Sequence, residues 1–368
     1  MDHFHYREGQ YFAEGVPLAR IASVVGTPCY VYSRAILEKR WRLFNDAFGD
    51  YPHRIHYAVK ANGNLAILKL LRQMGSGFDI VSGGELERVL KAGGRPDDIV
   101  FSGVGKRQSE ITTALKSGIH CINVESVAEL DRVNHIAGTL GLVADVALRI
   151  NPDVDPHTHP YISTGLRENK FGIPADQVHG LVRQAHDANH VNIIGLACHI
   201  GSQLTDLSPF IAALDCVMDL VFSLEQEGLQ LKHLDIGGGL GIRYGDETPP
   251  EPDAYVKALL DALFARQCRL PLFIEPGRAI VGNAGVLLTR VEYIKSAESH
   301  QFAVVDAAMN DLLRPALYGA HHSVIEVSPA DVKSSTYDVV GPICETADFL
   351  SRNQQLSISS GDFLVVQS

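Results

Sequence analysis

Short β-branched runs alternate with amphipathic stretches from about residue 33 to residue 275. The runs predict eight strands, at residues 54–60, 77–81, 98–102, 120–124, 144–150, 192–200, 232–236 and 271–274. Apolar positions three or four residues apart predict helices at 34–48, 65–74, 85–92, 108–117, 127–140, 176–188, 209–227 and 253–266. This α/β alternation favours a closed (β/α)8 barrel of the TIM type. An open doubly wound sheet is the alternative, but the first strand–helix turn carries no GxGxxG pattern.

The pattern changes after residue 278, where strand-like runs are separated by polar turns instead of long helices. These runs lie at residues 286–294, 301–305, 323–327, 337–340 and 363–366. They predict a C-terminal, mainly antiparallel β domain that resembles a sandwich or barrel. A further short run at Cys29–Tyr32 is expected to join it. The predicted organisation is therefore an N-terminal segment of the β domain (1–32), a barrel (33–278) and the β domain itself (279–368).

Composition narrows the class of protein. The chain has 368 residues, of which 46% are hydrophobic and 20% charged, as in ordinary globular proteins. A net charge of −11 argues against nucleic acid or an anionic membrane as partner. No apolar run is long enough to span a bilayer, and residues 1–5 do not resemble a secretory signal.

The six cysteines show no paired spacing, so disulfides and zinc are not expected and a cytoplasmic location is favoured. Two HxH pairs, His3 with His5 and His157 with His159, lack an obvious third ligand. No metal site is therefore predicted.

Polar residues and glycines stand at nearly every predicted strand end. Active sites of such barrels lie at the C-terminal ends of the strands, so these residues are candidates for one site. Any one of them has an ordinary structural explanation: Asp79 could cap a turn, and Arg149 could be an ion-paired strand residue. A full ring of them is harder to explain in that way. The ring consists of Lys60, Asp79, Ser102, Gly103, Glu125, Ser126, Arg149, Asn151, His199, Ser202, Gly237, Gly238, Gly239, Glu275, Pro276, Gly277 and Arg278.

Lys60 places an amine at the end of the first barrel strand. Enclosure there disfavours the charged amine, which suits Schiff-base chemistry. The run Gly237, Gly238 and Gly239 follows an apolar strand and could bring backbone N–H groups close to a phosphate, although a tight loop needing positive φ would look the same.

Two further residues fit the same ligand. The carboxylate of Glu275 could hold a pyridine nitrogen protonated, while the nearby guanidinium of Arg278 faces an anion. His199 could be a buried core histidine or a ring stacked on a cofactor. An amine, an anion cradle, an acid and a flat ring together describe pyridoxal 5'-phosphate.

Several motifs resemble those of the fold type III (alanine-racemase-fold) pyridoxal-phosphate decarboxylases: YAVKAN at 57–62, HIGSQ at 199–203, GGGLG at 237–241 and EPGR at 275–278. NDLLRPALY at 310–318 and GPICE at 341–345 are similar to the meso-diaminopimelate decarboxylases within that group. The resemblance covers essentially the whole chain. It implies a lyase of lysine biosynthesis that converts meso-2,6-diaminopimelate to L-lysine and carbon dioxide.

The resemblance also implies roles. Lys60 would carry the cofactor, His199 would stack on its ring, and Glu275 would bind the pyridine nitrogen. Asp79, Arg149 and Pro276 belong to the cofactor site, and Ser202, Gly237, Gly238, Gly239 and Gly277 to its phosphate. Arg278, Arg314 and Tyr318 would bind the substrate carboxylate, and Glu345 would bind the distal amino group of the substrate. Cys344 of the partner subunit in a head-to-tail homodimer would protonate the carbon that loses carbon dioxide.

Other activities remain open at this point. A racemase of this fold is expected to carry arginine where this chain has Glu275, and ornithine would not need the extra arginine, Arg314. A decarboxylase of another basic amino acid is the alternative enzyme. The family's chains continue beyond the equivalent of Ser368 through a glycine-and-tyrosine segment that contacts cofactor phosphate and substrate. The resemblance therefore also leaves room for a non-catalytic cofactor-binding protein.

Overall fold

The computed structural model describes residues 3–155, 164–165, 169–186, 188–296, 301–329 and 332–368. The pair His157 and His159 lies outside these residues. The chain forms two compact units, one made of residues 1–39, 242–248 and 281–368, and the other of residues 40–241 and 249–280. Among the described residues no helix is long and apolar enough to cross a membrane.

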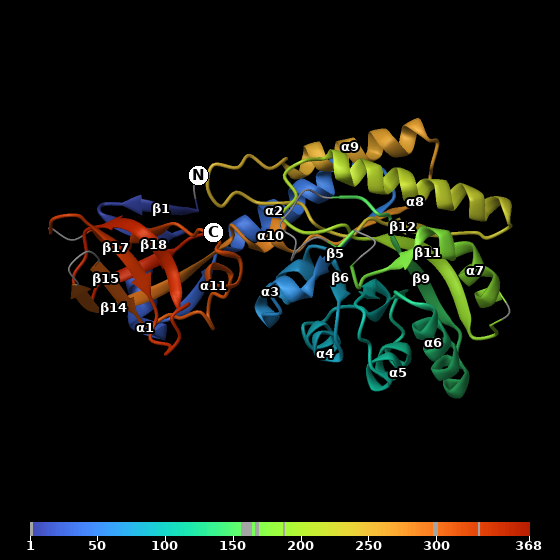
Figure 1. Cartoon of the computed structure of the whole chain (residues 1–368), viewed down its shortest axis with the longest axis horizontal. Coiled ribbons are helices and arrows are strands. Elements are labelled where there is room, and N and C mark those ends of the chain that lie inside the picture. Colours follow the sequence, from blue (N-terminus) through green and yellow to red (C-terminus); the bar gives the residue numbers. More distant parts are fainter. Residues whose placement is uncertain (1–2, 156–163, 166–168, 187, 297–300, 330–331) are drawn as a thin grey trace. The chain divides into compact units, whose positions relative to one another are not determined.

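The second unit is a closed parallel barrel, as the strand–helix alternation predicted (Figure 1). The strands pair in the order β9-β11-β12-β13-β5-β6-β7-β8, and β8 pairs with β9 to close the ring. β10 (Ile173–Pro174) adds to the end of β9. The eight strands are β5 (His53–Ala58), β6 (Gly77–Ile80), β7 (Ile99–Phe101), β8 (Cys121–Val124), β9 (Ala144–Asn151), β11 (Val191–Cys198), β12 (His233–Asp235) and β13 (Leu272–Ile274).

Helices follow the barrel strands in turn and bury their apolar faces against them. Three of these helices, α3, α4 and α6, begin at a side-chain cap, since Asn64, Ser82 and Ser126 each accept a hydrogen bond from a backbone N–H of the following turn. The helices are α2 (Arg34–Ala47), α3 (Leu65–Gln73), α4 (Gly83–Lys91), α5 (Gln108–Ser117), α6 (Val127–Leu140), α7 (Val178–His186), α8 (Ser208–Gln226), α9 (Pro252–Ala265) and the single-turn α10 (Arg278–Val281).

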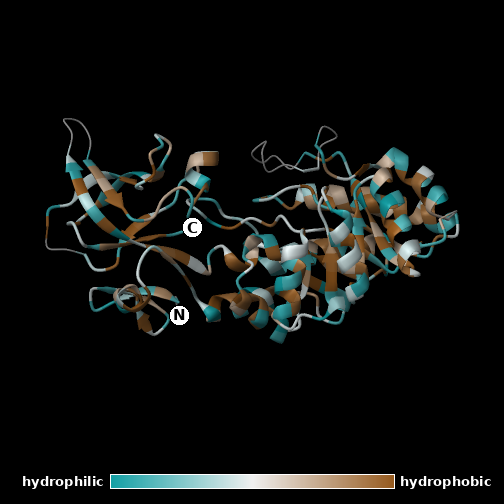
Figure 2. Ribbon diagram, turned by 90° about the horizontal axis from the view of Figure 1, so that it is seen from below, coloured by the Kyte–Doolittle hydropathy of each residue, from teal (hydrophilic) through white to brown (hydrophobic). Residues whose placement is uncertain are grey.

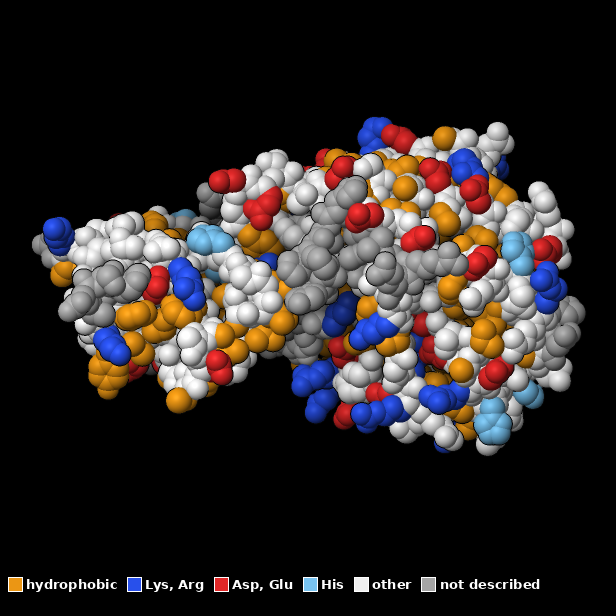
Figure 3. All heavy atoms as spheres, viewed as in Figure 1, with side chains coloured by type: hydrophobic (Ala, Val, Ile, Leu, Met, Phe, Trp, Pro, Cys, Tyr) orange, Lys and Arg blue, Asp and Glu red, His pale blue; other side chains and the backbone are white. Residues whose placement is uncertain are grey.

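Hydropathy follows this layering. Figure 2 shows the barrel strands mainly in brown and much of the outer surface of the helices in teal. On the face drawn in Figure 3, acidic and basic side chains are interspersed over the helices. The apolar strands are therefore enclosed by helices. The polar residues of the barrel strands lie at the strand ends and in the barrel interior.

The other unit is built on a mainly antiparallel sheet, again as predicted. Its strand order is β16-β19-β14-β15-β17-β18, and β15 with β17 is its one parallel pair among the described residues. β4 (Cys29–Tyr32) pairs antiparallel with β14. The strands are β14 (Gly285–Ser296), β15 (Gln301–Val305), β16 (Val324–Glu326), β17 (Ser335–Val340), β18 (Phe349–Leu356) and β19 (Phe363–Val366).

The hydrophobic pattern missed several elements of this unit. β18 reads FLSRNQQL and has no apolar run, yet it pairs along β17. Its strand state depends on that partner and on the burial of Leu350 and Leu356. The pattern also missed the N-terminal sheet β1 (Phe4–Arg7), β2 (Gln10–Ala13) and β3 (Val16–Pro17), the helix α1 (Leu18–Val25) and the short helix α11 (Arg314–Tyr318).

Candidate active site

Lys60 lies at the C-terminal mouth of the barrel. The strand predicted to reach it ends at Ala58, and Lys60 belongs to a single 3-10 turn, Val59–Ala61. Its Nζ donates to Asp79 Oδ2 at 2.6 Å. Asp79 comes from the neighbouring strand β6, where it is opposite Ala58, and its side chain is fully buried, whereas that of Lys60 is 49% exposed. The barrel therefore presents an accessible amine against a buried carboxylate.

This ion pair decides the charge of Lys60. Enclosure by the barrel mouth opposes the ammonium form, but the carboxylates of Asp79 and Glu275 outweigh it, so the pKa of Lys60 is raised. Enclosure does disfavour the ammonium form, as expected from the sequence, but the neighbouring carboxylates more than compensate for it. The chain holds Lys60 as an ammonium until something changes the charge around it.

Glu275 follows β13 and lies in the barrel interior beside Asp235 of β12. Burial raises the pKa of Glu275 well above its usual value, and the charges of Asp235 and Asp79 raise it further. Burial likewise raises the pKa of Asp235, to about 6, although Gly237 N–H donates to its Oδ1 at 2.8 Å. Burial and the neighbouring acids therefore favour the protonated form of Glu275.

Two amide or hydroxyl groups complete the surroundings of Glu275. Asn123 Nδ2 donates to Glu275 Oε1 at 3.4 Å and to Ser102 Oγ at 3.0 Å. Ser102 Oγ lies 3.5 Å from the same carboxyl oxygen. All three side chains are buried. They fix the orientation of the carboxyl group from β7, β8 and β13.

His199 stands just after the end of β11, and its ring is oriented by the glycine loop. Gly238 N–H donates to His199 Nδ1 at 3.2 Å, so this nitrogen is unprotonated and the imidazole proton is on Nε2. Burial, and then the positive charges of Arg149 and Lys60, lower the pKa of His199 well below its usual value. The ring is therefore neutral and held in one tautomer.

The glycine loop leaves no room for side chains. A Cβ at Gly238 would lie 2.2 Å from the carbonyl oxygen of Glu275, and one at Gly239 would lie 2.6 Å from that of Gly201. Gly237 and Gly239 also have φ values of +69° and +116°. The loop is therefore a tight turn with positive φ values, and the same turn brings its backbone close to the site. The structural and the ligand-binding explanation of the glycines are thus compatible.

Arg149 is a buried ion-paired residue, and this pairing also places it in the site. Its Nη1 donates to Glu125 Oε1 at 2.8 Å, and its guanidinium lies 4.9 Å from the centre of the Phe171 ring. Glu125 also accepts from the N–H groups of Gly103 and Gly172. The guanidinium is therefore fixed at the C-terminal end of β9.

The turn at 275–278 packs on the turn that carries Lys60. Pro276 O accepts from Ala58 N at 3.2 Å, and a Cβ at Gly277 would lie 3.1 Å from the Ala58 Cβ. Arg278 Nε donates to Ser202 Oγ at 3.2 Å. The barrel unit thus gathers the cofactor-site residues that the sequence indicated around one mouth.

The other predicted residues belong to the β unit. Arg314 begins α11, donates to His322 Nε2 at 2.8 Å and lies 3.9 Å from the centre of the Tyr244 ring. His322 is buried and in turn donates from Nδ1 to Gln367 O at 2.7 Å. Tyr318 ends the same helix. Arg314 is therefore a positioned cation.

Cys344 and Glu345 lie on an exposed turn between β17 and β18. The buried carboxylate of Asp348 organises this turn, because its oxygens accept from Ile343 N at 2.8 Å and Met309 N at 2.6 Å. The turn therefore presents a thiol and a carboxylate on a defined backbone.

Sequence reasoning missed the role of Asp235, Asn123 and His322 in these networks. Asp235 and Asn123 each interrupt an otherwise apolar strand. A polar residue in a buried strand is unusual and could have indicated a functional position. His322 follows no periodic pattern, so only the folded β unit reveals it.

Pyridoxal 5'-phosphate fits these residues by its chemistry. An accessible amine suits its aldehyde, a proton-holding acid pair suits its pyridine nitrogen, and a neutral flat ring suits stacking. Asp79 Oδ1 and Asp235 Oδ2 are buried and lack a hydrogen-bond partner among the described residues. Ser202 and Arg278 supply a hydroxyl and a guanidinium for an anion.

Comparison with known proteins agrees with this chemistry. The family model described as pyridoxal-dependent decarboxylase, pyridoxal binding domain, matches residues 34–282. With a closed barrel and this site, the match defines the class of protein as a pyridoxal-dependent decarboxylase.

Proteins of similar sequence and structure identify the family within this class. A diaminopimelate decarboxylase of Vibrio cholerae is 57% identical over 100% of this chain and 88% of its own, and one of Pseudomonas aeruginosa is 55% identical with the same coverage. The crystal structure of diaminopimelate decarboxylase from Helicobacter pylori complexed with L-lysine has a TM-score of 0.91 and 41% identity, over 95% of this chain and 88% of its own. That from M. jannaschii in co-complex with L-lysine has a TM-score of 0.94 and 36% identity, over 100% and 87%. The chain belongs to the diaminopimelate decarboxylase family, which confirms the resemblance seen in its motifs.

Proposed function

We propose that this protein uses pyridoxal 5'-phosphate to decarboxylate meso-diaminopimelate to L-lysine. The observation that carries the proposal is the pairing, at one barrel mouth, of the amine of Lys60 with the proton-holding acids Glu275 and Asp235. The membership of this chain in the diaminopimelate decarboxylase family supports meso-diaminopimelate as the substrate. When bound, the cofactor supplies a protonated ring that accepts the electron pair left on Cα as carbon dioxide departs.

Lys60 is the amine that attaches the cofactor aldehyde. Its ammonium must lose a proton to solvent for this, and the Asp79 carboxylate lies 2.6 Å from Nζ. The buried carboxylate then remains beside the site, where its negative charge favours cationic nitrogen.

Glu275 supplies the proton of the pyridine ring. Its raised pKa keeps the carboxyl protonated before the cofactor binds, and Asp235 stabilises the acid form from behind. With the cofactor bound, Glu275 would hold the ring nitrogen protonated. An arginine at the same place would disfavour a protonated ring nitrogen. The glutamate found here therefore favours decarboxylation over racemisation.

The remaining barrel residues position the cofactor. The neutral ring of His199 would stack on it, and Arg149 would lie in the same site. Ser202, the loop at 237–239, Gly277 and Arg278 bind its phosphate. Because Gly237 and Gly238 already donate to Asp235 and His199, the N–H of Gly239 is our candidate for the phosphate within that loop.

Substrate recognition uses two arginines and an acid. Arg314, Arg278 and Tyr318 bind substrate carboxylate, and Glu345 binds the distal ammonium. Cys344 of the partner subunit in a homodimer donates the proton to the carbon. We place this biosynthetic reaction in the cytoplasm.

A substrate panel tests the proposal. Carbon dioxide release is measured with meso-, LL- and DD-diaminopimelate, ornithine and arginine, and the cofactor absorbance is recorded for the wild type and Lys60→Ala. Turnover of the meso isomer alone, with the bound-cofactor band absent from Lys60→Ala, is expected. Preference for another amino acid, or a cofactor band without any turnover, contradicts the proposal.

A further inference from the structure

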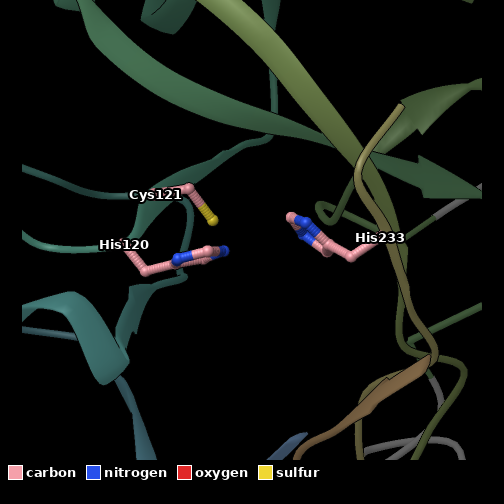
Figure 4. A group of neighbouring side chains, drawn as sticks. All are labelled: His120, Cys121 and His233. Atoms are coloured by element: carbon pink, nitrogen blue, oxygen red, sulfur yellow. The ribbon is translucent and has the colours of Figure 1, made fainter. Parts of the chain in front are cut away.

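A histidine–cysteine–histidine cluster lies at the opposite end of the barrel from Lys60. His120 and Cys121 stand at the start of β8, and His233 is the first residue of β12. Figure 4 shows the three side chains pointing toward one another. One ligand atom from each lies within 4.8 Å of the other two.

The nitrogens of this cluster are buried without partners. Cys121 and His233 are each 1% exposed, and His120 is partly buried. Among the described residues, His120 Nε2 and both ring nitrogens of His233 have no hydrogen-bond partner. Buried polar atoms are normally satisfied, so these unpartnered nitrogens point to a ligand that is not part of the protein.

The surrounding groups form a mostly apolar cage. Phe273 stacks on His233 with ring centres 4.2 Å apart and lies 5.5 Å from His120. His56 contacts the other side of Phe273, with its own ring nitrogens unpartnered as well. Phenylalanine would fill this space without any polar cost, so aromatic packing alone does not explain the choice of histidine.

Charged groups of both signs surround the cluster. Arg54 lies 5.9 Å from the centre of the Phe273 ring and is paired with Asp98. Arg54, Asp145, Asp98 and Lys232 act on His120 at the same barrel end, and the buried Asp235 acts on Cys121 from the barrel interior. The ligand atoms and their burial, and not the surrounding charge, favour a cation here.

We propose that His120, Cys121 and His233 bind one Zn²⁺ ion. Two imidazole nitrogens and a thiolate are ligands that zinc prefers, with bonds of about 2.0–2.3 Å. Tetrahedral ligands at such distances are ~3.3–3.8 Å apart, so the side chains need to close by about 1 Å from the 4.8 Å limit. Binding releases the thiol proton of Cys121 to solvent, and no electron transfer is involved. Water fills the fourth position.

The ion has a structural role. It ties β8 to β12, which are not neighbours in the barrel, at the end away from the residues of the decarboxylation site. An ion that binds only the folded chain raises its thermal stability without taking part in turnover. The inference is independent of the proposed function.

Cobalt is the probe, because Co²⁺ takes the place of zinc and reports its ligands by colour. The chelator-treated holoenzyme is titrated with Co²⁺ and then with Zn²⁺, and bound metal is measured by mass spectrometry. We expect about one Co²⁺ per chain, a thiolate charge-transfer band, tetrahedral ligand-field bands, and loss of these bands as Zn²⁺ displaces Co²⁺.

Cys121→Ser and His233→Ala should each weaken metal binding by about a hundredfold or more. Cys268→Ser, at another buried cysteine of the barrel unit, and His190→Ala should bind as the wild type does. The proposal is overturned if wild-type enzyme shows no thiolate band, or if Cys121→Ser keeps it. The wild-type spectrum alone decides the matter should a variant fail to fold.

Discussion

The carboxyl group of Glu275 lies in the barrel interior beside that of Asp235, whose negative charge raises the pKa of Glu275. Neither carboxyl group reaches solvent freely, since both are at most 8% exposed. Because the two acids are close together, the protonation of Glu275 depends on the charge of Asp235.

Asp235→Asn should change the pH dependence of stability. Burial raises the pKa of Asp235 from 3.8 to about 6, so the folded chain binds this proton more tightly than the unfolded chain. The contribution of this group is therefore fully present below pH 4 and is lost as pH rises to about 6. Urea unfolding of cofactor-free protein should show a decline on the order of 1–3 kcal/mol across this window in the wild type that is absent from the variant. Identical slopes for both proteins would contradict the assignment.

Asp79→Asn should make Lys60 reactive at lower pH. The Asp79 carboxylate helps to raise the pKa of Lys60, so its removal favours the neutral amine. The rate of cofactor attachment, followed by stopped-flow absorbance, should reach half its maximum at a lower pH than in the wild type. Asp98→Asn removes an ion-paired carboxylate at the other barrel end and should leave the profile unchanged. An unshifted profile in Asp79→Asn sinks the proposed coupling.

Gly238→Ala should disrupt the cofactor loop. The added Cβ would meet the Glu275 carbonyl oxygen at 2.2 Å, and moving the loop would break the hydrogen bond to His199. We expect a loss of about 1–3 kcal/mol in unfolding free energy, together with weaker cofactor binding by fluorescence titration. Gly105→Ala is the matched control, because its Cβ would meet nothing within 4 Å. Wild-type cofactor affinity in Gly238→Ala would refute the role of the loop.

His322→Ala should affect substrate more than cofactor. His322 accepts the hydrogen bond that orients Arg314, and Arg314 is proposed to bind the substrate carboxylate. KM for meso-diaminopimelate should rise about 10–100-fold, as expected when a charge-assisted contact worth ~1.5–3 kcal/mol is lost. Cofactor affinity should remain as in the wild type. A fall in kcat with unchanged KM would assign His322 to a different step.

Cys344→Ala should lower kcat by about 10²–10⁴, the usual contribution of a positioned acid. Mixing this variant with Lys60→Ala tests whether the thiol comes from the partner subunit. If it does, about half of all dimers are mixed and each mixed dimer has one complete site in two, so activity should recover to about a quarter of wild type. Mixtures that remain as inactive as their parents would show that both groups act within one chain.

The barrel could be predicted from sequence because its signal is local and repeated. Each buried parallel strand needs an apolar run and each covering helix an apolar stripe, so eight alternations leave few other folds. The motifs at 57–62 and 275–278 in turn indicated the ends of strands where ligand chemistry gathers. β18 was missed because its sequence is mostly polar and its strand state comes from pairing with β17.

By itself, the sequence determined the order of strands and helices, the amine and acid at the barrel mouth, and through its motifs the family. The raised pKa values of Lys60 and Glu275, and the cluster of His120, Cys121 and His233, were decided only by the tertiary structure. The physical reason is that periodicity depends on neighbours along the chain. A pKa or a ligand set depends on groups that are far apart in sequence and meet only when the barrel closes.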